Sequence, residues 1–336
     1  MSVLRNSTIL VTGGTGSFGK AFVQHALAFL DPELVLVYSR DELKQYEIRQ
    51  HFPAEPRLRP VIGDIRDRDR LTHCMRGVDF VVHAAALKQV DTAEGQGFEF
   101  VKTNVVGSQN VIDAALANGV RQVVALSTDK ASSPINLYGA TKMVADKLFT
   151  SSDGGPTRFS VVRYGNVMGS RGSVIPLFQR LGARTGASLP ITDKRMTRYL
   201  ITLDEAVRFV VETFDVMRGG ELYVPKIPSV RISDLAEAIA PGCPTYEVGI
   251  RPGEKVHEEL IAAEDSQRTF QSADRYVVMP TIRRVGYLAP EGCRRVEEGF
   301  RYRSDLNSDW LGVEELRALV ELIDGPGEPC AVVAPR

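Results

Sequence analysis

The sequence predicts an α/β protein in which a doubly wound parallel sheet is followed by a smaller C-terminal domain. Short apolar runs alternate with amphipathic stretches through the first half of the chain, which is typical of parallel sheets covered by helices on both faces. A cluster of glycines follows the first apolar run, at residues 13–19. After about Gly165 the alternation stops, and Gly and Pro become frequent. The second half is therefore expected to be loop-rich.

The elements of the first domain follow from this pattern. Strands are expected at residues 8–12, 34–38, 58–62, 80–83, 122–126 and 160–163. Helices are expected at residues 20–30, 42–51, 67–75, 101–118, 138–149 and 203–217. The first domain then comprises residues 1–169 and 200–219, and the second comprises residues 170–199 and 220–324. Residues 325–336 are rich in Pro and Gly and are expected to fray.

Length and composition exclude several classes of protein. The chain has 336 residues, enough for two domains at roughly 150 residues each. Its 41 basic and 42 acidic residues give a net charge of −1, which argues against a general affinity for nucleic acid. It has neither a signal-peptide pattern nor the apolar run of ~18 residues that spans a membrane. The four cysteines are scattered along the chain, so we expect reduced thiols in a cytoplasmic protein. They also lack the spacing of metal ligands, so no metal site is expected; they are Cys74, Cys243, Cys293 and Cys330.

The segment that joins the first strand to the first helix reads Thr-Gly-Gly-Thr-Gly-Ser-Phe-Gly, residues 12–19. Glycines there let the backbone approach a pyrophosphate, and the helix N-terminus offers N–H groups to it. We interpret the segment as the dinucleotide-binding turn of a Rossmann domain; a purely structural tight turn is the alternative. Its cofactor-binding residues are expected to be Thr12, Gly13, Gly16, Ser17, Phe18 and Gly19.

The ends of the following strands indicate which dinucleotide binds. An acidic residue after the second strand would hold the ribose 2′-hydroxyl of NAD. Here Ser39 is followed by Arg40 and Lys44, which suit a 2′-phosphate, so NADP is predicted; Asp41 keeps NAD as the alternative. His83 is as readily a hydrogen-bonded strand-end residue as a functional one. Further cofactor contacts are expected after the third and fourth strands, from Asp64, Ile65, Ala84, Ala85 and Ala86.

The residues after the fifth strand suggest acid–base chemistry. The strand ends in Thr128, Asp129 and Lys130, and Tyr138 and Lys142 follow four residues apart, on one face of a predicted helix. The Lys142 ammonium should favour the phenolate and lower the pKa of Tyr138, which could then deprotonate a sugar hydroxyl. An exposed helical pair and a strand-end ion pair are the structural alternatives for these two motifs.

Nearly the whole chain resembles the extended short-chain dehydrogenase/reductases that act on nucleotide sugars. Within that family it is most similar to the inverting UDP-N-acetylglucosamine 4,6-dehydratases. The resemblance lies in long stretches that occur in family order, among them TGGTGSFGK, YSRDELKQYE, HAAALK, STDKASSPINLYGATK, VVRYGNVMGSRGSV, ITDKRMTRYLITLDEA and IRPGEKVHE. A membrane-anchored, retaining branch has Met in place of Tyr138, so the tyrosine favours the inverting branch.

The resemblance implies a mechanism and further site residues. Tyr138, assisted by Lys142, would deprotonate the carbon 4 hydroxyl while NADP⁺ accepts the hydride. Lys130 would remove the carbon 5 proton, Asp129 would protonate the departing carbon 6 hydroxyl, and Thr128 would complete the catalytic set. Lys88 and Asn104 would contact the cofactor. The nucleotide sugar, with UDP-N-acetylglucosamine as the expected substrate, would be bound by Lys88, Asn166, Arg171, Val174, Arg195, Arg198, Arg251 and Glu254.

The chain departs from the family pattern at residues 89–97. The usual histidine, aromatic ring and two prolines are missing there, and Asp91 adds a carboxylate. This change predicts a roomier and less rigid wall beside the sugar. It leaves two alternatives open: a 4-epimerase or a dehydratase of altered substrate or regiochemistry, and a non-catalytic NADP-binding sensor. Family resemblance also implies a homo-oligomer.

Overall fold

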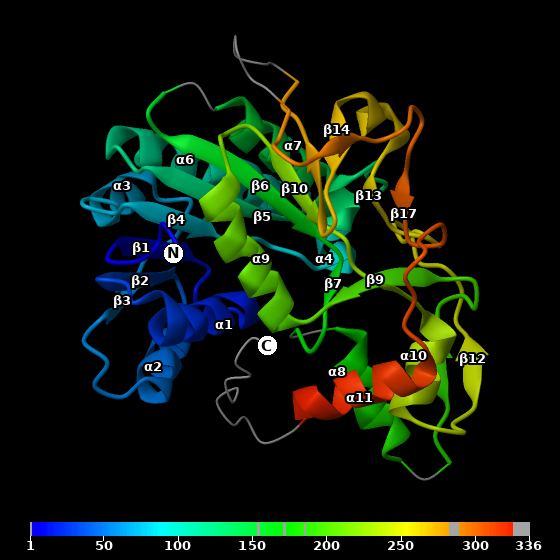
Figure 1. Cartoon of the computed structure of the whole chain (residues 1–336). Coiled ribbons are helices and arrows are strands. Elements are labelled where there is room, and N and C mark those ends of the chain that lie inside the picture. The colour runs from blue at the N-terminus through cyan, green and yellow to red at the C-terminus, as the bar shows by residue number, and fades with distance from the viewer. Residues whose placement is uncertain (1, 153–154, 171–172, 185, 282–288, 325–336) are drawn as a thin grey trace, which may run out of the picture.

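The computed structural model describes residues 2–152, 155–170, 173–184, 186–281 and 289–324. Its centre is a ten-stranded sheet (Figure 1). In spatial order the strands are β16 (Arg294–Arg295), β14 (Thr269–Gln271), β15 (Arg275–Val278), β10 (Leu222–Pro225), β6 (Arg158–Tyr164), β5 (Gln122–Thr128), β4 (Phe80–His83), β1 (Thr8–Thr12), β2 (Leu34–Ser39) and β3 (Leu58–Ile62).

The strands from β3 to β10 run parallel, with the order 3-2-1-4-5-6 of a Rossmann domain. The central strands β1, β4 and β6 are almost entirely buried because their sequences are nearly continuous apolar runs, as a sheet covered on both faces requires. The register pairs Thr12 with His83 and Thr128 with Tyr164. The strand ends therefore meet at one edge, and the predicted fold class is confirmed.

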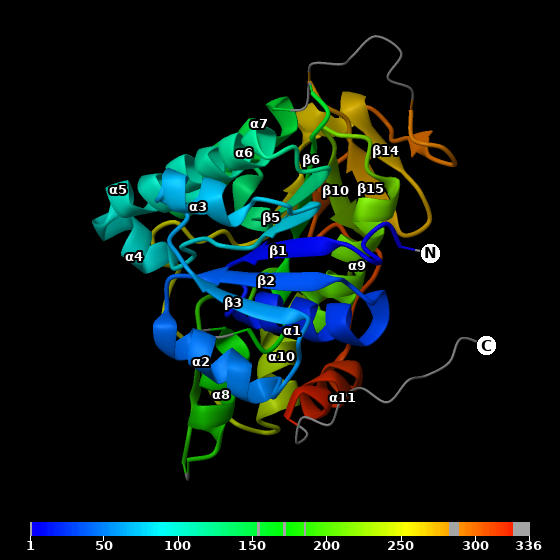
Figure 2. The same cartoon turned by 90° about the vertical axis from the view of Figure 1, so that its left-hand side faces the viewer.

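Helices cover both faces of the sheet (Figure 2). One face carries α3 (Arg68–Cys74), α6 (Gly107–Ala117) and α7 (Leu137–Ser151). The other carries α1 (Ser17–His25), α2 (Glu42–His51) and α9 (Leu203–Val216). Two helices are extended by π-helical turns, at Ala26–Leu30 after α1 and at Val101–Val106 before α6. Two short helices, α4 (Val90–Gly95) and α5 (Gly97–Phe100), occupy the segment that departs from the family pattern.

A smaller second region has its own core, formed by α8 (Val174–Gly182), α10 (Ile232–Ile239) and α11 (Val313–Asp324). Its strands form three small sheets: β7 (Asn166–Val167), β9 (Thr197–Ile201) and β11 (Ser229–Arg231); β8 (Leu189–Ile191) and β12 (Thr245–Glu247); and β13 (Glu259–Ile261) and β17 (Tyr302–Arg303). Two 3₁₀ turns, Asp129–Ala131 and Ala263–Arg268, complete the elements.

The predicted domain boundary differs from the structure in one respect. Residues 220–324 were assigned to the second domain, yet β10, β14, β15 and β16 belong to the large sheet. These strands are only two to four residues long, and β14, which reads TFQ, has a single apolar residue, so they lack the pattern of the earlier strands. The predicted tail, residues 325–336, lies outside the described residues.

A buried ionic cluster fixes α7 against the strands that carry the site. Asp146 of α7 accepts hydrogen bonds from Ser127 Oγ at 2.7 Å and from Arg163 Nη2 at 2.9 Å. Arg163 also donates to the Leu260 carbonyl at 3.0 Å. Both charged side chains are at most 7% exposed. The cluster therefore joins β5, β6 and β13 to the helix behind the cleft.

Replacing Asp146 by Ala should destabilise the protein by about 3–5 kcal/mol, because the Arg163 charge then stays buried without its partner. Urea unfolding followed by circular dichroism measures the loss. Asp113→Ala is the matched control, since Asp113 pairs with the exposed Arg68 and should cost about 1 kcal/mol or less. Equal losses in the two variants would contradict the assignment.

Candidate active site

The glycine turn leaves a helix N-terminus open at the edge of the sheet. Gly13 has a φ of +65°, and a Cβ there would lie 2.8 Å from the backbone of Ala85. A Cβ on Gly19 would lie 2.4 Å from Gly14 Cα, so glycine is required for close packing of the turn. Gly16 is the N-cap residue of α1 and, having no side chain, makes no capping hydrogen bond. The N–H groups at this helix N-terminus and the positive end of the helix suit a pyrophosphate.

A cleft of about 1030 Å³ extends from this turn into the second region. Most of the predicted site residues line it. Those from the Rossmann domain, on its strand ends, loops and helices, are Gly13, Gly16, Ser17, Phe18, Gly19, Ser39, Arg40, Lys44, Asp64, Ile65, Ala84, Ala85, Ala86, Lys88, Thr128, Lys130, Tyr138 and Lys142. Those from the second region are Asn166, Val174, Arg198, Arg251 and Glu254. Residues from both predicted domains therefore line the same cleft.

Two cationic side chains face the cleft where β2 ends. Arg40 and Lys44 line it beside Ser39, whereas Asp41 does not. The Asp41 carboxylate is used locally, because it caps α2 through the Lys44 N–H at 3.0 Å and pairs with Lys44 Nζ at 2.7 Å. Asp41, the acidic residue that kept NAD as the alternative cofactor in the sequence analysis, thus acts as a helix cap.

Two predicted cofactor contacts lie behind the cleft wall and do not line it. Thr12 is fully buried and hydrogen-bonds His83 Nδ1 at 2.8 Å. Asn104 is 1% exposed and brackets Leu87, accepting from its N–H at 2.8 Å and donating to its carbonyl at 2.9 Å. In this structure their side chains hold the turn and Leu87 in place, and direct contact with the cofactor stays a prediction for both.

Burial controls the pKa of Tyr138. The tyrosine is 8% exposed and packs edge-to-face on Phe100. Desolvation raises the pKa of Tyr138 to about 12, although the Lys130 charge and a hydrogen bond with Thr128 oppose this. Lys142 donates to the Leu126 carbonyl at 2.7 Å, and burial lowers its own pKa. The expectation that Lys142 lowers the pKa of Tyr138 is therefore wrong in this structure, where Lys130 is the cation acting on the phenol.

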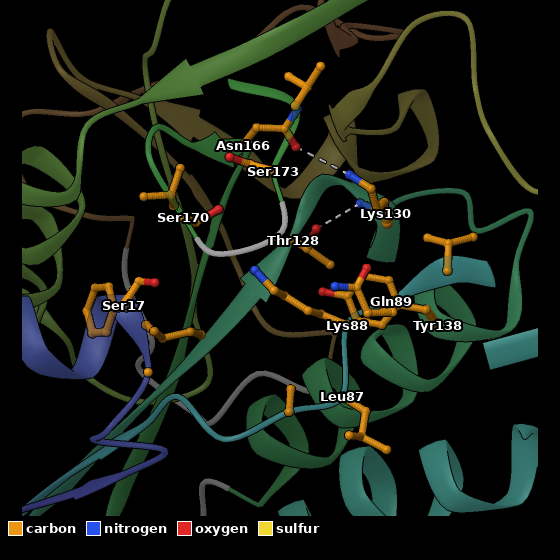
Figure 3. Close-up of a pocket in the computed structure, with 18 of the residues that line it drawn as sticks. Ser17, Leu87, Lys88, Gln89, Thr128, Lys130, Tyr138, Asn166, Ser170 and Ser173 are labelled. Carbon is orange, nitrogen blue, oxygen red and sulfur yellow. Dashed lines mark hydrogen bonds between the residues drawn. The ribbon is translucent and has the colours of Figure 1, made fainter. Parts of the chain in front are cut away.

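Asp129 and Lys130 form a buried ion pair at the end of β5. Asp129 Oδ1 accepts from Lys130 Nζ at 2.9 Å and from Thr128 Oγ1 at 2.8 Å. Burial alone would raise the pKa of Asp129, but these two neighbours outweigh it and hold the pKa below its usual range. Lys130 and Thr128 line the cleft (Figure 3). Asp129 is fully buried and does not line it.

The second region contributes polar groups from several elements. Asn166 points its side-chain oxygen at Lys130 Nζ, 3.5 Å away (Figure 3). Arg198 is 11% exposed and donates to the carbonyls of Thr197 and Val256, so its guanidinium is partly occupied. Its charge also acts on Asp129 and Lys130. Arg251 is half exposed and lies 3.7 Å from Asp91 across the cleft.

Two predicted substrate residues are not among the residues described as lining the cleft, for different reasons. Arg195 is 72% exposed and pairs with Asp193 at the surface, so its expected contact with substrate is not supported. Arg171 lies outside the described residues. Sequence reasoning also missed Glu258, a buried carboxylate that lines the cleft 3.7 Å from Lys130 Nζ. Glu258 ends the Arg-Pro-Gly-Glu-Lys-Val-His-Glu stretch, so its signal lay in a motif already singled out.

Residues 9–280 match the polysaccharide biosynthesis protein family. The chain belongs to this family. A relative from Campylobacter jejuni, named UDP-N-acetylglucosamine 4,6-dehydratase (inverting), is 47% identical over 96% of this chain and 100% of its own length. A Rickettsia akari relative, named UDP-glucose 4-epimerase, is 39% identical over 95% of this chain and 96% of its own length.

Solved structures of the same fold extend these similarities. Pen from Bacillus thuringiensis matches with a TM-score of 0.87 and 37% identity, over 95% of this chain and 98% of that one. DesIV, a dTDP-glucose 4,6-dehydratase from Streptomyces venezuelae solved with NAD and TYD bound, matches with a TM-score of 0.66 and 28% identity, over 74% of this chain and 86% of that one. The resemblance to the extended short-chain dehydrogenase/reductases is confirmed.

Among the described residues, no three His, Cys, Asp or Glu side chains are grouped to hold a metal ion. In the same part of the chain, no helix is both long and apolar enough to cross a membrane.

The pH dependence of stability should report on His83, which is buried under the glycine turn. Burial, and then the Lys142 charge, lower the pKa of His83 to about 3, so the folded protein keeps it neutral. The unfolded chain binds the proton near pH 6.5, so stability is lost as the pH falls below that value. Between about pH 7 and 5, the wild type should lose about 2 kcal/mol more than His83→Gln, measured by urea unfolding.

The matched control for this prediction is His51→Gln, which alters an exposed histidine at the end of α2. His51→Gln should keep the wild-type dependence on pH. If His83→Gln also kept it, His83 would not be the buried neutral group that the structure indicates.

Proposed function

We propose that this chain is a UDP-N-acetylglucosamine 4,6-dehydratase that inverts carbon 5 and yields a 4-keto-6-deoxy sugar. The 47% identical relative of that name, which aligns over 96% of this chain, supports this activity. The observation that carries the proposal is the buried Asp129–Lys130 pair, 2.9 Å apart, at the same cleft as Tyr138. Oxidation at carbon 4 requires only the tyrosine, whereas loss of water requires the additional acid and base.

The alternative is a 4-epimerase, because the Rickettsia relatives carry that name at 38–39% identity. An epimerase removes and returns a hydride at carbon 4 and has no proton to abstract from carbon 5. It therefore has no use for an acid and a base that are hydrogen-bonded to each other. Retention of Tyr138, Lys142 and this pair together also opposes a non-catalytic sensor.

The proton steps follow from the ionisation of the pair. Lys130 is a cation and Asp129 an anion, so Lys130 first passes one proton to Asp129 along their 2.9 Å hydrogen bond. Neutral Lys130 then takes the carbon 5 proton from the 4-keto sugar. Asp129 supplies the proton with which the carbon 6 hydroxyl leaves as water, through Thr128, which hydrogen-bonds Asp129 and faces the cleft. The pair then has its original charges.

The remaining groups orient the sugar and the cofactor. A nicotinamide dinucleotide held at the glycine turn and at Arg40 and Lys44 would accept the carbon 4 hydride and supply it again at carbon 6. Burial keeps most of Tyr138 as the neutral phenol, so the hydroxyl proton is taken by its minor phenolate form, which the Lys130 charge favours. Carbon 5 then takes a proton from solvent on the face opposite Lys130, and Tyr138 returns the carbon 4 hydroxyl proton to solvent, so no group gains or loses a proton overall. The half-exposed Arg251 suits an incoming diphosphate, and Glu254, whose Oε2 has no hydrogen-bond partner in the described structure, suits a ribose hydroxyl.

The cofactor we propose is NADP. Arg40 and Lys44 face the cleft at the end of β2, and no acidic side chain from residues 39–44 lines it there. We also propose a cytoplasmic homo-oligomer. The thiols of Cys74, Cys243 and Cys293 are unbridged, which supports a reducing compartment. Phe98 of α5 and Val106 at the end of the π-helical turn that follows it are exposed apolar side chains, which supports an interface between copies.

Incubation with UDP-N-acetylglucosamine in deuterated water tests the reaction. We expect loss of one water by mass spectrometry, deuterium at carbon 5 and a new carbon 6 methyl signal by proton NMR. Lys130→Met should slow this turnover by at least about 10²-fold, because it removes the base. Lys147→Met, on the same helix as Tyr138 but outside the cleft, should keep wild-type turnover.

Two outcomes would contradict the dehydratase. Conversion of the substrate to its carbon 4 epimer, with unchanged mass and undiminished in Lys130→Met, would favour the epimerase. No turnover of this or of other nucleotide sugars, with the cofactor still bound, would favour the sensor.

Arg40→Ala should weaken NADP binding by about tenfold, because it removes one charged contact with the 2′-phosphate, and should leave NAD binding unchanged. Isothermal titration calorimetry with each dinucleotide measures the difference. Arg68→Ala, an exposed arginine that does not line the cleft, is the control. Equal weakening of NAD and NADP by Arg40→Ala would mean that Arg40 does not select between them.

A further inference from the structure

The Lys130 ammonium is surrounded by three acceptors. Its Nζ lies 2.9 Å from Asp129 Oδ1, 3.5 Å from Asn166 Oδ1 and 3.7 Å from Glu258 Oε1. The first two are hydrogen bonds, and the third is an ion pair longer than a hydrogen bond. Asp129 follows β5, Asn166 begins β7, and Glu258 directly precedes β13. Lys130 is therefore fixed from three elements, two of which belong to the second region.

Glu258 is held firmly although its carboxylate is incompletely paired. The residue is 3% exposed, and Ser304 fixes its backbone on both sides: the Glu258 N–H donates to Ser304 Oγ at 3.0 Å, and the Ser304 N–H donates to the Glu258 carbonyl at 2.8 Å. Its Oε1 lies 3.8 Å from Arg198 Nε, and its Oε2 has no hydrogen-bond partner in the described structure. A buried carboxylate with so few hydrogen bonds is costly to keep, so its stabilisation comes from the cations beside it.

We propose that Glu258 is a positioning residue for the Asp129–Lys130 pair, which holds the Lys130 ammonium at the cleft and limits how readily Lys130 passes its proton to Asp129. The inference rests on the proposed function, in which that transfer precedes loss of water. The Asp129 carboxylate pairs with the Lys130 ammonium from the end of β5, and the Glu258 carboxylate pairs with it from the second region. With both carboxylates charged, the ammonium is favoured over the neutral amine.

The charges around Lys130 agree with this role. Burial by itself would lower the pKa of Lys130, but the charges of Asp129 and Glu258 raise it above its usual range. The groups facing it are Asp129 and Tyr138 from the first region, Glu258 and Arg198 from the second, and Lys88 and Lys255, both of which carry lowered pKa values through burial and, in part, the Lys130 charge. Among these, Asp129 and Glu258 are the two anions.

Glu258 also links the substrate-binding segment to the chemistry. It belongs to the same stretch as Arg251 and Glu254, and Lys255 within that stretch donates to the Ser132 carbonyl at 2.6 Å, next to the catalytic turn. The substrate-binding residues and Glu258 therefore share one short segment of chain, which is packed against the turn that carries Lys130.

Glu258→Gln tests the proposal because it removes the charge and keeps the shape. Glu259→Gln is the matched control, since Glu259 is equally buried but pairs with Arg301 and Ser133. The first measurement follows the Lys130 side chain by NMR of ¹³Cε-lysine-labelled protein against pH, with the signal assigned by its loss in Lys130→Met. In Glu258→Gln the signal should move at a pH lower by about one unit or more, and in Glu259→Gln it should match the wild type.

The second measurement is the pH profile of kcat for the dehydration of UDP-N-acetylglucosamine. The pH at which kcat declines on the alkaline side should be lower in Glu258→Gln by the same amount as the NMR titration. KM should change less than twofold. An unmoved Lys130 signal in Glu258→Gln, or an equal movement in Glu259→Gln, would overturn the positioning role. The NMR titration needs no turnover, so an inactive wild type would refute the proposed function without deciding the role of Glu258.

Discussion

Parallel pairing of the central strands is the constraint on which the site depends. Because β1, β4, β5 and β6 run in one direction, their carboxyl ends meet at one edge of the sheet. The glycine turn, His83 and the 128–130 segment are brought together there from distant parts of the sequence. The second region closes this edge into a cleft, and the Asp146–Arg163 cluster keeps α7 in register with it.

Local signals explain why most of this site could be predicted. The glycine turn, the residues after each strand and the tyrosine one turn before a lysine are all readable from short spacings. Glu258 could not be placed from spacing, because its relation to Lys130 is a tertiary contact between separate elements. The side chains of Thr12 and Asn104 could not be placed for the same reason: sequence shows that a residue is near the edge, and only packing shows which side of the wall it occupies.

The electrostatics of the cleft also departed from simple expectation. A tyrosine four residues before a lysine suggests a lowered phenol pKa, but burial outweighs the nearby charges and raises it. The Lys142 ammonium is instead satisfied by a strand carbonyl. Alternating charges from Asp129 through Lys130 and Glu258 to Arg198 keep the cluster close to neutral, which lowers the cost of burying four ionised side chains.

Charges along the cleft differ in how far they are exposed to solvent, as the ion pair between Asp91 and Arg251 shows when it is compared with the carboxylates around Lys130. The two partners of that ion pair are 75% and 52% exposed, whereas Asp129 and Glu258 are at most 4% exposed. Mobile ions screen exposed charges over about 10 Å at 0.1 M ionic strength but penetrate little into buried clusters. Ionic strength therefore acts on the rate at which an anion is admitted at the mouth, and leaves the proton-transfer groups in the interior almost unaffected.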